Sequence, residues 1–73
     1  MSEAAAPPAV LVNGAPLPWR DGLSVAAVLA DRGDPREAVT TALNGRFVPR
    51  DAREHTLLAP GDALTLFHAI VGG

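Results

Sequence analysis

The side chains of this sequence that could do catalytic chemistry are few and scattered. Neither of the two histidines, His55 and His68, has a cysteine or a pair of carboxylates at the spacing of metal ligands. Asp51, Glu54 and Asp62 lie in polar, turn-like segments, where a solvated charge is the ordinary state. No set of acid, base, nucleophile or metal ligands emerges, so the sequence predicts a protein that is not itself an enzyme.

The last two residues, Gly72 and Gly73, suggest a different kind of chemistry. Because glycine has no side chain, such a chain end can enter a narrow slot and bring its carboxylate to the α-phosphate of a nucleotide. The carboxylate would then be the reacting group, and no catalytic side chain would be needed. A frayed end that merely permits a bend is the alternative, and the two glycines alone do not decide between the two interpretations.

Composition narrows the class of protein further. The chain has 73 residues, no cysteine, no lysine and a formal net charge of −2. It therefore has room for one small core and no means of disulfide, cysteine–zinc or lysine Schiff-base chemistry. Low aromatic content and a net charge of −2 argue against nucleic-acid binding, which needs a basic patch. No apolar run approaches the roughly 20 residues of a membrane span. Because the first residues also lack a signal-peptide pattern, we expect a cytoplasmic protein. A small acidic domain with a free tail is expected to be a monomer between partner encounters.

Hairpin signals predict most of the sheet. Asn-Gly pairs at 13–14 and 44–45 each stand between apolar stretches, the strongest short-range signal of a two-residue hairpin turn. Pro16 and Pro18 cannot donate to a strand ladder, so the strand that holds them belongs at an edge. Residues 51–58 are polar and irregular, with room for one helical turn. The sequence predicts strands at residues 9–12, 15–19, 38–43, 46–48 and 63–70.

One helix of two to three turns is predicted after residue 24. Ser24 is a favoured N-cap, and we prefer that role to that of a nucleophile. Val25, Val28 and Leu29 form a narrow apolar stripe at helical spacing. Gly33 fits the position just after the helix, where a left-handed residue is common.

These elements predict an α+β fold with the helix packed across one face of a mixed sheet of four to five strands. The last strand is long and apolar on both faces, so it belongs at the centre, and parallel pairing with the first strand would put it there. That arrangement is the ubiquitin-like β-grasp. We expect a flexible extension at residues 1–8, the domain at 9–70 and a flexible tail at 71–73.

Short motifs in a fixed order carry a resemblance that covers residues 10–73. They are Val-Asn-Gly at 12–14, Ser-Val-Ala-Ala-Val-Leu at 24–29, Leu-Asn-Gly at 43–45, Val-Pro-Arg at 48–50, Leu-x-Pro-Gly-Asp at 58–62 and the terminal Gly-Gly. With these motifs the chain resembles the ThiS sulfur carriers of thiamine biosynthesis, in the broader family that includes the small subunit of molybdopterin synthase. It departs from them in its N-terminal extension and in Val71, where glutamine is common.

The resemblance implies a mechanism and a set of partners. An E1-like (ThiF-like) adenylyltransferase would use ATP and Mg²⁺ to adenylate the carboxylate of Gly73. A cysteine desulfurase or another persulfide donor would supply the sulfur that displaces AMP and leaves a thiocarboxylate. A thiazole synthase (ThiG-like) would take that sulfur. Gly72 and Val71 would form the tail that reaches the partner, and the carrier itself would bind no cofactor.

The predicted strands also indicate a partner surface. If Leu64 and Leu66 face the helix, Phe67 and Thr65 face away from it, and with Leu11 they would form an apolar patch on the open face of the sheet. Coverage of Phe67 by residues 51–58 is an equal alternative. Arg50 could contact an acidic partner at the rim of the patch, although ordinary solvation explains a surface arginine as well.

Two other functions stay open. The chain could be a sulfur carrier for another pathway, such as molybdopterin, cysteine or a specialised metabolite. It could instead be a ubiquitin-like binding module in which the Gly-Gly is incidental or serves protein conjugation. Deleting Gly73 separates the carrier from the module, because only the carrier would lose all function.

Overall fold

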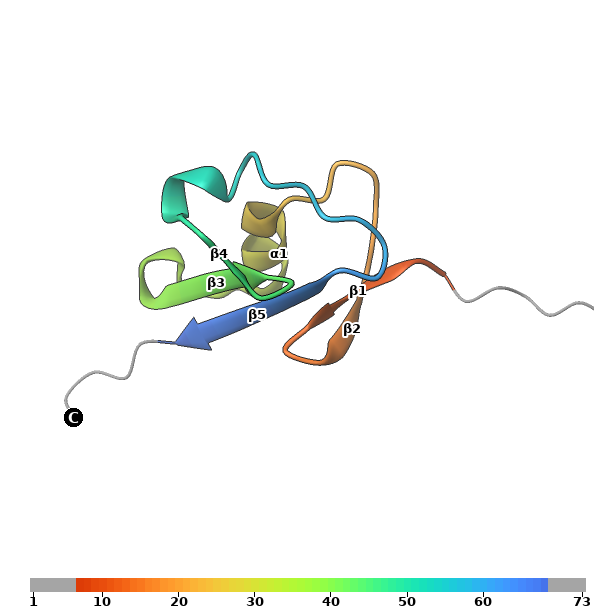
Figure 1. Ribbon diagram of the computed structural model, residues 1–73, viewed down its shortest axis with the longest axis horizontal. Coiled ribbons are helices and arrows are strands. Elements are labelled where there is room, and N and C mark those ends of the chain that lie inside the picture. The colour runs from red at the N-terminus through yellow and green to blue at the C-terminus, as the bar shows by residue number, and fades with distance from the viewer. Residues whose placement is uncertain (1–6, 69–73) are drawn as a thin grey trace, which may run out of the picture.

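The computed structural model describes residues 7–68, and within them the chain forms one mixed sheet with a helix across one face (Figure 1). The central strand β5 pairs in parallel with β1 and antiparallel with β3, as the sequence predicted. This topology is that of a ubiquitin-like β-grasp. The five strands are β1 (Ala9–Val12), β2 (Ala15–Pro18), β3 (Val39–Leu43), β4 (Arg46–Val48) and β5 (Ala63–His68), in the order β2-β1-β5-β3-β4.

Two asparagines build the hairpins and also hold the central strand. Asn13 and Asn44 have φ of 52° and 50°, and the glycines that follow them are also left-handed, as a type I′ turn requires. The side-chain oxygen of Asn13 accepts a hydrogen bond from the backbone N–H of Leu66 at 2.8 Å. That of Asn44 accepts one from the N–H of Ala63 at 2.9 Å. The two turns therefore fix the position of β5 as well as reversing the chain.

Helix α1 (Val25–Arg32) begins and ends where its capping residues predict. The hydroxyl of Ser24 accepts a hydrogen bond from the N–H of Ala27 at 3.1 Å. Gly33 is left-handed, with φ of 77°, and its N–H donates to the carbonyl of Ala30. The next N–H, that of Asp34, donates to Leu29 at 3.0 Å, which completes a Schellman motif. Asp34 is thereby held directly at the end of the helix.

The core lies between α1 and one face of the sheet. The apolar stripe of the helix is fully buried, and each such Val or Leu side chain contributes about 1.5–3 kcal/mol relative to exposure. Leu23 and Leu58 close the core from the connections on either side of it. The buried apolar residues are Val10, Val12, Leu23, Val25, Val28, Leu29, Val39, Val48, Leu58, Leu64 and Leu66.

The edge strand β2 carries its two prolines in a particular register. The N–H of Trp19 donates to the carbonyl of Pro8 at 3.0 Å, so alternate residues of β2 bond to β1. Pro16 and Pro18 occupy the other positions, opposite Leu11 and Ala9, where a backbone N–H would point to the open edge. The prolines therefore remove no bond from the ladder, and the prediction of an edge strand is confirmed.

Several boundaries differ from those predicted. A 3-10 turn, η1 (Arg36–Ala38), precedes β3, so that strand starts at Val39 rather than at residue 38. Strand β2 ends at Pro18 rather than at Trp19, whose indole N–H donates to the carbonyl of Leu58 at 2.6 Å. A second 3-10 turn, η2 (Arg50–Ala52), lies in the connection expected to be irregular. Residues 69 and 70 of the predicted last strand, the tail at 71–73 and most of the N-terminal extension lie outside the described residues.

Candidate functional site

The face of the sheet opposite α1 is uncharged in the described part of the chain. Alternation along the strands and the pairing register place ten side chains on it, and we call this surface the open sheet face. Helix α1 and the connection from β4 to β5 lie on the other side of the sheet (Figure 1). The ten residues are Ala9, Leu11, Pro16, Pro18, Thr40, Ala42, Phe47, Ala63, Thr65 and Phe67.

Three large apolar side chains are exposed on the open sheet face, those of Leu11, Phe47 and Phe67. Phe67 is 55% exposed and Leu11 is 41% exposed, while Thr65 between them is half-buried. Residues 51–58 do not cover Phe67, so that alternative is wrong. A patch of this kind on a small protein usually marks a partner site.

Phe47 is 66% exposed on the same face and was not among the surface residues predicted from the sequence. Phe47 is paired with Ala42, and Phe67 with Thr40, so the two rings lie on either side of β3. A signal for Phe47 was available. The two-residue turn at 44–45 sets the register of β4, and the burial of Val48 then requires that Phe47 face outward.

Arg50 does not lie on the open sheet face. It begins η2, in the connection on the helix side, and its guanidinium donates to the carbonyl of Glu37 at 3.2 Å. It also lines a shallow hollow with Arg36, Asp51 and Glu54, in which the charges are balanced. The structure thus brings together Phe67, Thr65 and Leu11, and it separates Arg50 from them.

Arg53 is buried, which the sequence did not suggest. Its side chain donates to the carbonyl of Arg36 at 3.0 Å and to that of Val39, and its Nε has no partner among the described residues. Burial, reinforced by the positive charges of Arg50 and Arg36, lowers the pKa of Arg53 below its ordinary value. Arg53 therefore ties the connection between β4 and β5 to the start of β3.

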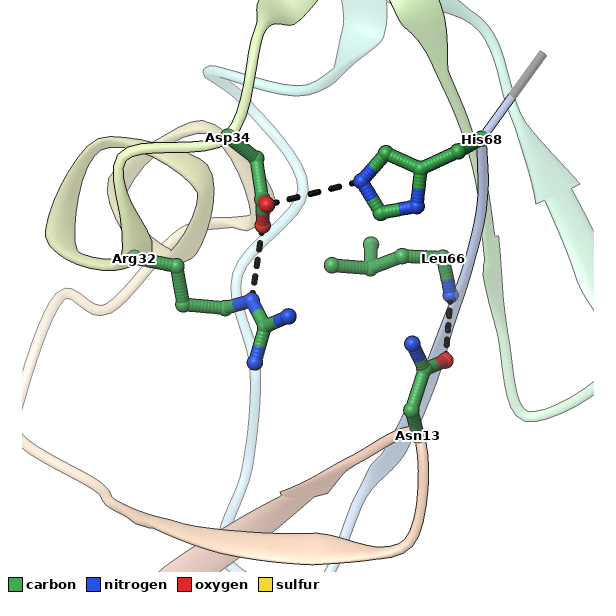
Figure 2. A network of polar contacts seen from close by, with 5 residues as sticks. All are labelled: Asn13, Arg32, Asp34, Leu66 and His68. Atoms are coloured by element: carbon green, nitrogen blue, oxygen red, sulfur yellow. Dashed lines mark hydrogen bonds and ion pairs between the residues drawn. The ribbon is translucent and has the colours of Figure 1, made fainter. Parts of the chain in front are cut away.

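The end of β5 is held by a small polar network (Figure 2). Asp34 accepts a hydrogen bond from Nε of Arg32 at 2.7 Å, and its other carboxylate oxygen lies 3.5 Å from Nε2 of His68. The hydrogen bond from Arg32 is the main reason that the pKa of Asp34 is lowered, and His68 adds to it. His68 pairs with Val39 at the last position of the β3–β5 ladder.

The predicted tail residues Val71, Gly72 and Gly73 lie outside the described residues. What the structure places is the point from which they follow, since His68 is the last described residue and Phe67 of the open sheet face precedes it. Within residues 7–68 no three His, Cys, Asp or Glu side chains are gathered as metal ligands. No helix in that range is long and apolar enough to cross a membrane.

The parallel β1–β5 pair, the single helix across the sheet and the uncharged opposite face define a small ubiquitin-like β-grasp protein. The sequence model of the ThiS family matches residues 10–73. The chain belongs to the ThiS family. No curated protein matches it significantly.

Two solved structures are similar along nearly the whole chain. The crystal structure of the thiamine biosynthesis protein ThiS from Geobacter metallireducens is 33% identical, with a TM-score of 0.71. The match covers 89% of this chain and 99% of that one. A solution NMR structure of a thiamine biosynthesis protein from the same organism is 31% identical, with a TM-score of 0.72, and the match covers 89% and 87% of the two chains. The resemblance found in the sequence motifs is thereby confirmed.

Proposed function

We propose that this chain is a sulfur carrier of thiamine biosynthesis whose Gly73 carboxylate is activated and converted to a thiocarboxylate. Membership of the ThiS family and the two similar thiamine biosynthesis proteins support the pathway. One observation on this molecule carries the proposal furthest: the exposed Phe67 on an uncharged sheet face lies next to the last described residue of the strand that leads to Gly73. A partner docked on that face would have the chain end within reach.

The proposed chemistry takes place at the carboxylate alone. Its oxygen attacks the α-phosphate of ATP, with Mg²⁺, in an E1-like adenylyltransferase, and pyrophosphate leaves. The terminal sulfur of a persulfide, supplied by a cysteine desulfurase or similar donor, then attacks the acyl carbon and AMP leaves. The product is an acyl disulfide that joins the carrier to the sulfur donor. A second thiol attacks the donor's sulfur in this S–S bond, forms a new disulfide with the donor, and releases the thiocarboxylate as the leaving group.

In this scheme the chain is a co-substrate. It binds no cofactor of its own, because ATP and Mg²⁺ belong to the adenylyltransferase. A thiazole synthase consumes the thiocarboxylate and regenerates the carboxylate for another cycle. These partners would place the reaction in the cytoplasm. The lack of lysine suits such a carrier, since an activated acyl end has no side-chain amine of its own chain to acylate.

Intact-mass spectrometry tests the proposal. The purified chain is incubated with ATP, Mg²⁺, a persulfide donor and the adenylyltransferase of its own organism. We expect a gain of about 16 Da, the replacement of oxygen by sulfur, which fragmentation confines to Gly73. The same gain on Met1 or Trp19 is oxidation and does not count. A chain that lacks Gly73 is the matched control.

Two results would redirect the proposal. A mass that stays unmodified with every component present would favour the non-carrier binding module, which should keep most of its affinity for a sheet-face partner when Gly73 is deleted. A thiocarboxylate that forms but is not consumed by thiazole synthase would keep the carrier role. It would move the acceptor to another pathway, such as molybdopterin, cysteine or a specialised metabolite.

A further inference from the structure

The C-terminal end of β5 is paired with a neighbouring strand on one side only, whereas its first residues are paired on both sides. Strand β1 pairs with β5 only at Ala63 and Leu64. Beyond these residues, the side-chain oxygen of Asn13 accepts one hydrogen bond from the backbone N–H of Leu66. Among the described residues, the backbone of His68 is paired only with Val39 of β3. A strand end held on one side is the part of a sheet that opens most readily.

A side-chain contact on the helix side adds a second point of support. Asp34 is itself well fixed, because its N–H closes the Schellman motif and its carboxylate accepts from Arg32 at 2.7 Å. Its side chain is only 13% exposed. The imidazole of His68 points at this carboxylate, with Nε2 at 3.5 Å from Oδ1 (Figure 2).

We propose that Asp34 and His68 form a charge-dependent attachment that fixes the end of β5 to the end of α1 and so positions the start of the segment that carries Gly73. The positioning role rests on the proposed function, whereas the attachment itself does not. Both are positioning residues, since they act on the reacting carboxylate only through the chain between them and Gly73.

The groups around His68 make the strength of the attachment depend on the charge of the imidazole. Asp34 faces the imidazole directly, and Arg32 lies behind that carboxylate. The C-terminal end of α1 also favours a cation nearby. On the sheet side His68 is paired with Val39 of β3, which does not titrate.

A protonated imidazole would therefore hold the carboxylate more tightly than a neutral one. The separation of 3.5 Å is long for a charge-assisted hydrogen bond, which ordinarily measures about 2.7–2.9 Å. Protonation is expected to draw the two groups together, and histidine is the side chain that ordinarily changes charge between pH 5 and 8.

The consequence for a carrier is the placement of its chain end. Phe67 and His68 are adjacent, with Phe67 on the open sheet face and His68 toward the helix. A partner that docks on Phe67 gains from a chain that leaves the sheet at a fixed point, because less conformational freedom is lost when the end enters the active site. Release of His68 would lower the fraction of docked complexes that react.

NMR on the isolated chain tests the attachment without any partner. The imidazole of His68 and the backbone amides of residues 69–73 are followed from pH 5 to 8 in wild type and in Asp34→Asn. We expect the amides to titrate together with His68 in wild type and to lose most of that response in Asp34→Asn. His55, which is exposed in the connection between β4 and β5, is the internal control. Equal responses in the two proteins would overturn the attachment.

Adenylation of Gly73 tests the positioning role. At pH 6.5 we expect kcat/KM to fall about two- to fivefold in Asp34→Asn and His68→Gln, the range that a partly exposed ion pair supplies. Docking affinity measured without ATP should stay unchanged. Asp34→Glu should restore part of the rate, and His68→Lys, which stays charged, should remove the pH dependence that separates wild type from His68→Gln.

The outcomes separate the two proposals. A parallel loss of docking affinity and melting temperature would show a merely structural role and overturn the positioning. If the NMR response is found but no variant, nor the wild type, is adenylated, the carrier role fails and the attachment stands. If the wild type is adenylated and the NMR response is missing, the attachment fails and the carrier role stands.

Discussion

The guanidinium of Arg53 donates a hydrogen bond to the carbonyl of Val39, and Val39 is the residue paired with His68 at the end of β5. A buried cation in the connection between β4 and β5 thus supports the strand that leads out of the domain. Asp34 supports the same strand end from α1. Residues from two separate connections therefore converge on the position where the chain leaves the sheet.

Replacement of Arg53 should destabilise the whole domain. Arg53→Ala leaves the carbonyls of Arg36 and Val39 without their donor and opens a cavity, so we expect the free energy of unfolding to fall by about 2–4 kcal/mol. Urea denaturation followed by circular dichroism measures it. Arg46→Ala, on the exposed edge strand, is the control and should change stability by at most about 0.5 kcal/mol. Equal midpoints for the two variants would contradict the structural role of Arg53.

The open sheet face should carry most of the affinity for the adenylyltransferase. We expect Phe67→Ser and Phe47→Ser each to weaken docking by about thirtyfold, as loss of an aromatic anchor commonly does. Calorimetry without ATP measures this, and melting temperatures should hardly change because both rings are exposed. Leu57→Ser is the matched control, since Leu57 is 60% exposed but belongs to the helix side. A comparable loss from Leu57→Ser would place the docking surface elsewhere.

Asp34 should contribute to stability in a pH-dependent manner. The hydrogen bond from Arg32, aided by His68, holds the pKa of Asp34 below the ordinary value of about 3.9 that it has in the unfolded chain. Its contribution is therefore complete above that value and is lost as the pH falls through the lower, folded pKa. Urea midpoints between pH 2 and 7 should differ between wild type and Asp34→Asn at the upper end and converge at the lower end. A constant difference at every pH would argue against the lowered pKa.

Asn13 combines a backbone role with a side-chain role, and two substitutions separate them. Asn13→Gly keeps a left-handed turn but loses the hydrogen bond to Leu66, and we expect a cost of about 0.5–1.5 kcal/mol. Asn13→Ala adds strain at a φ of 52° and should cost about 1 kcal/mol more. Chemical denaturation of both variants checks the order. An alanine variant as stable as the glycine variant would show that the turn relaxes to another type.

Local sequence signals predicted most of the fold. The two Asn-Gly pairs, the cap at Ser24 and the stop at Gly33 each act within a few residues, and the structure confirms them. The central position of β5 followed from an apolar pattern on both of its faces. The turn η2 overlaps the segment 51–58, where one helical turn was allowed for, whereas η1 was not predicted. Tertiary contacts help to hold both turns, among them the hydrogen bonds that Arg53 and Arg50 donate to distant carbonyls.

The outward-facing residues of the candidate site could be predicted, because side chains alternate between the two faces along a strand. The residues whose role depends on contacts between distant segments were missed. Phe67 and Leu11 face outward because neighbouring residues of their strands are buried. Asp62 looked like a solvated acid, yet it accepts from the side chain of Asn44 and from the N–H of Ala59. Arg53 and the Asp34–His68 contact join segments far apart in the sequence, and no local pattern in one sequence marks such a partnership.

The prolines of β2 have a consequence for how this protein behaves when it is abundant. An unpaired edge strand is a template to which strands of further chains can add, and this is a common route to insoluble fibrils. At β2 the two positions that would offer N–H groups to such a neighbour are Pro16 and Pro18, so that edge has no backbone donors to offer. In the described part of the chain, only the three-residue strand β4 presents another edge, and Pro49 cuts it short. The prolines therefore weaken edge-to-edge pairing as a route to aggregation in a protein that also exposes an apolar sheet face.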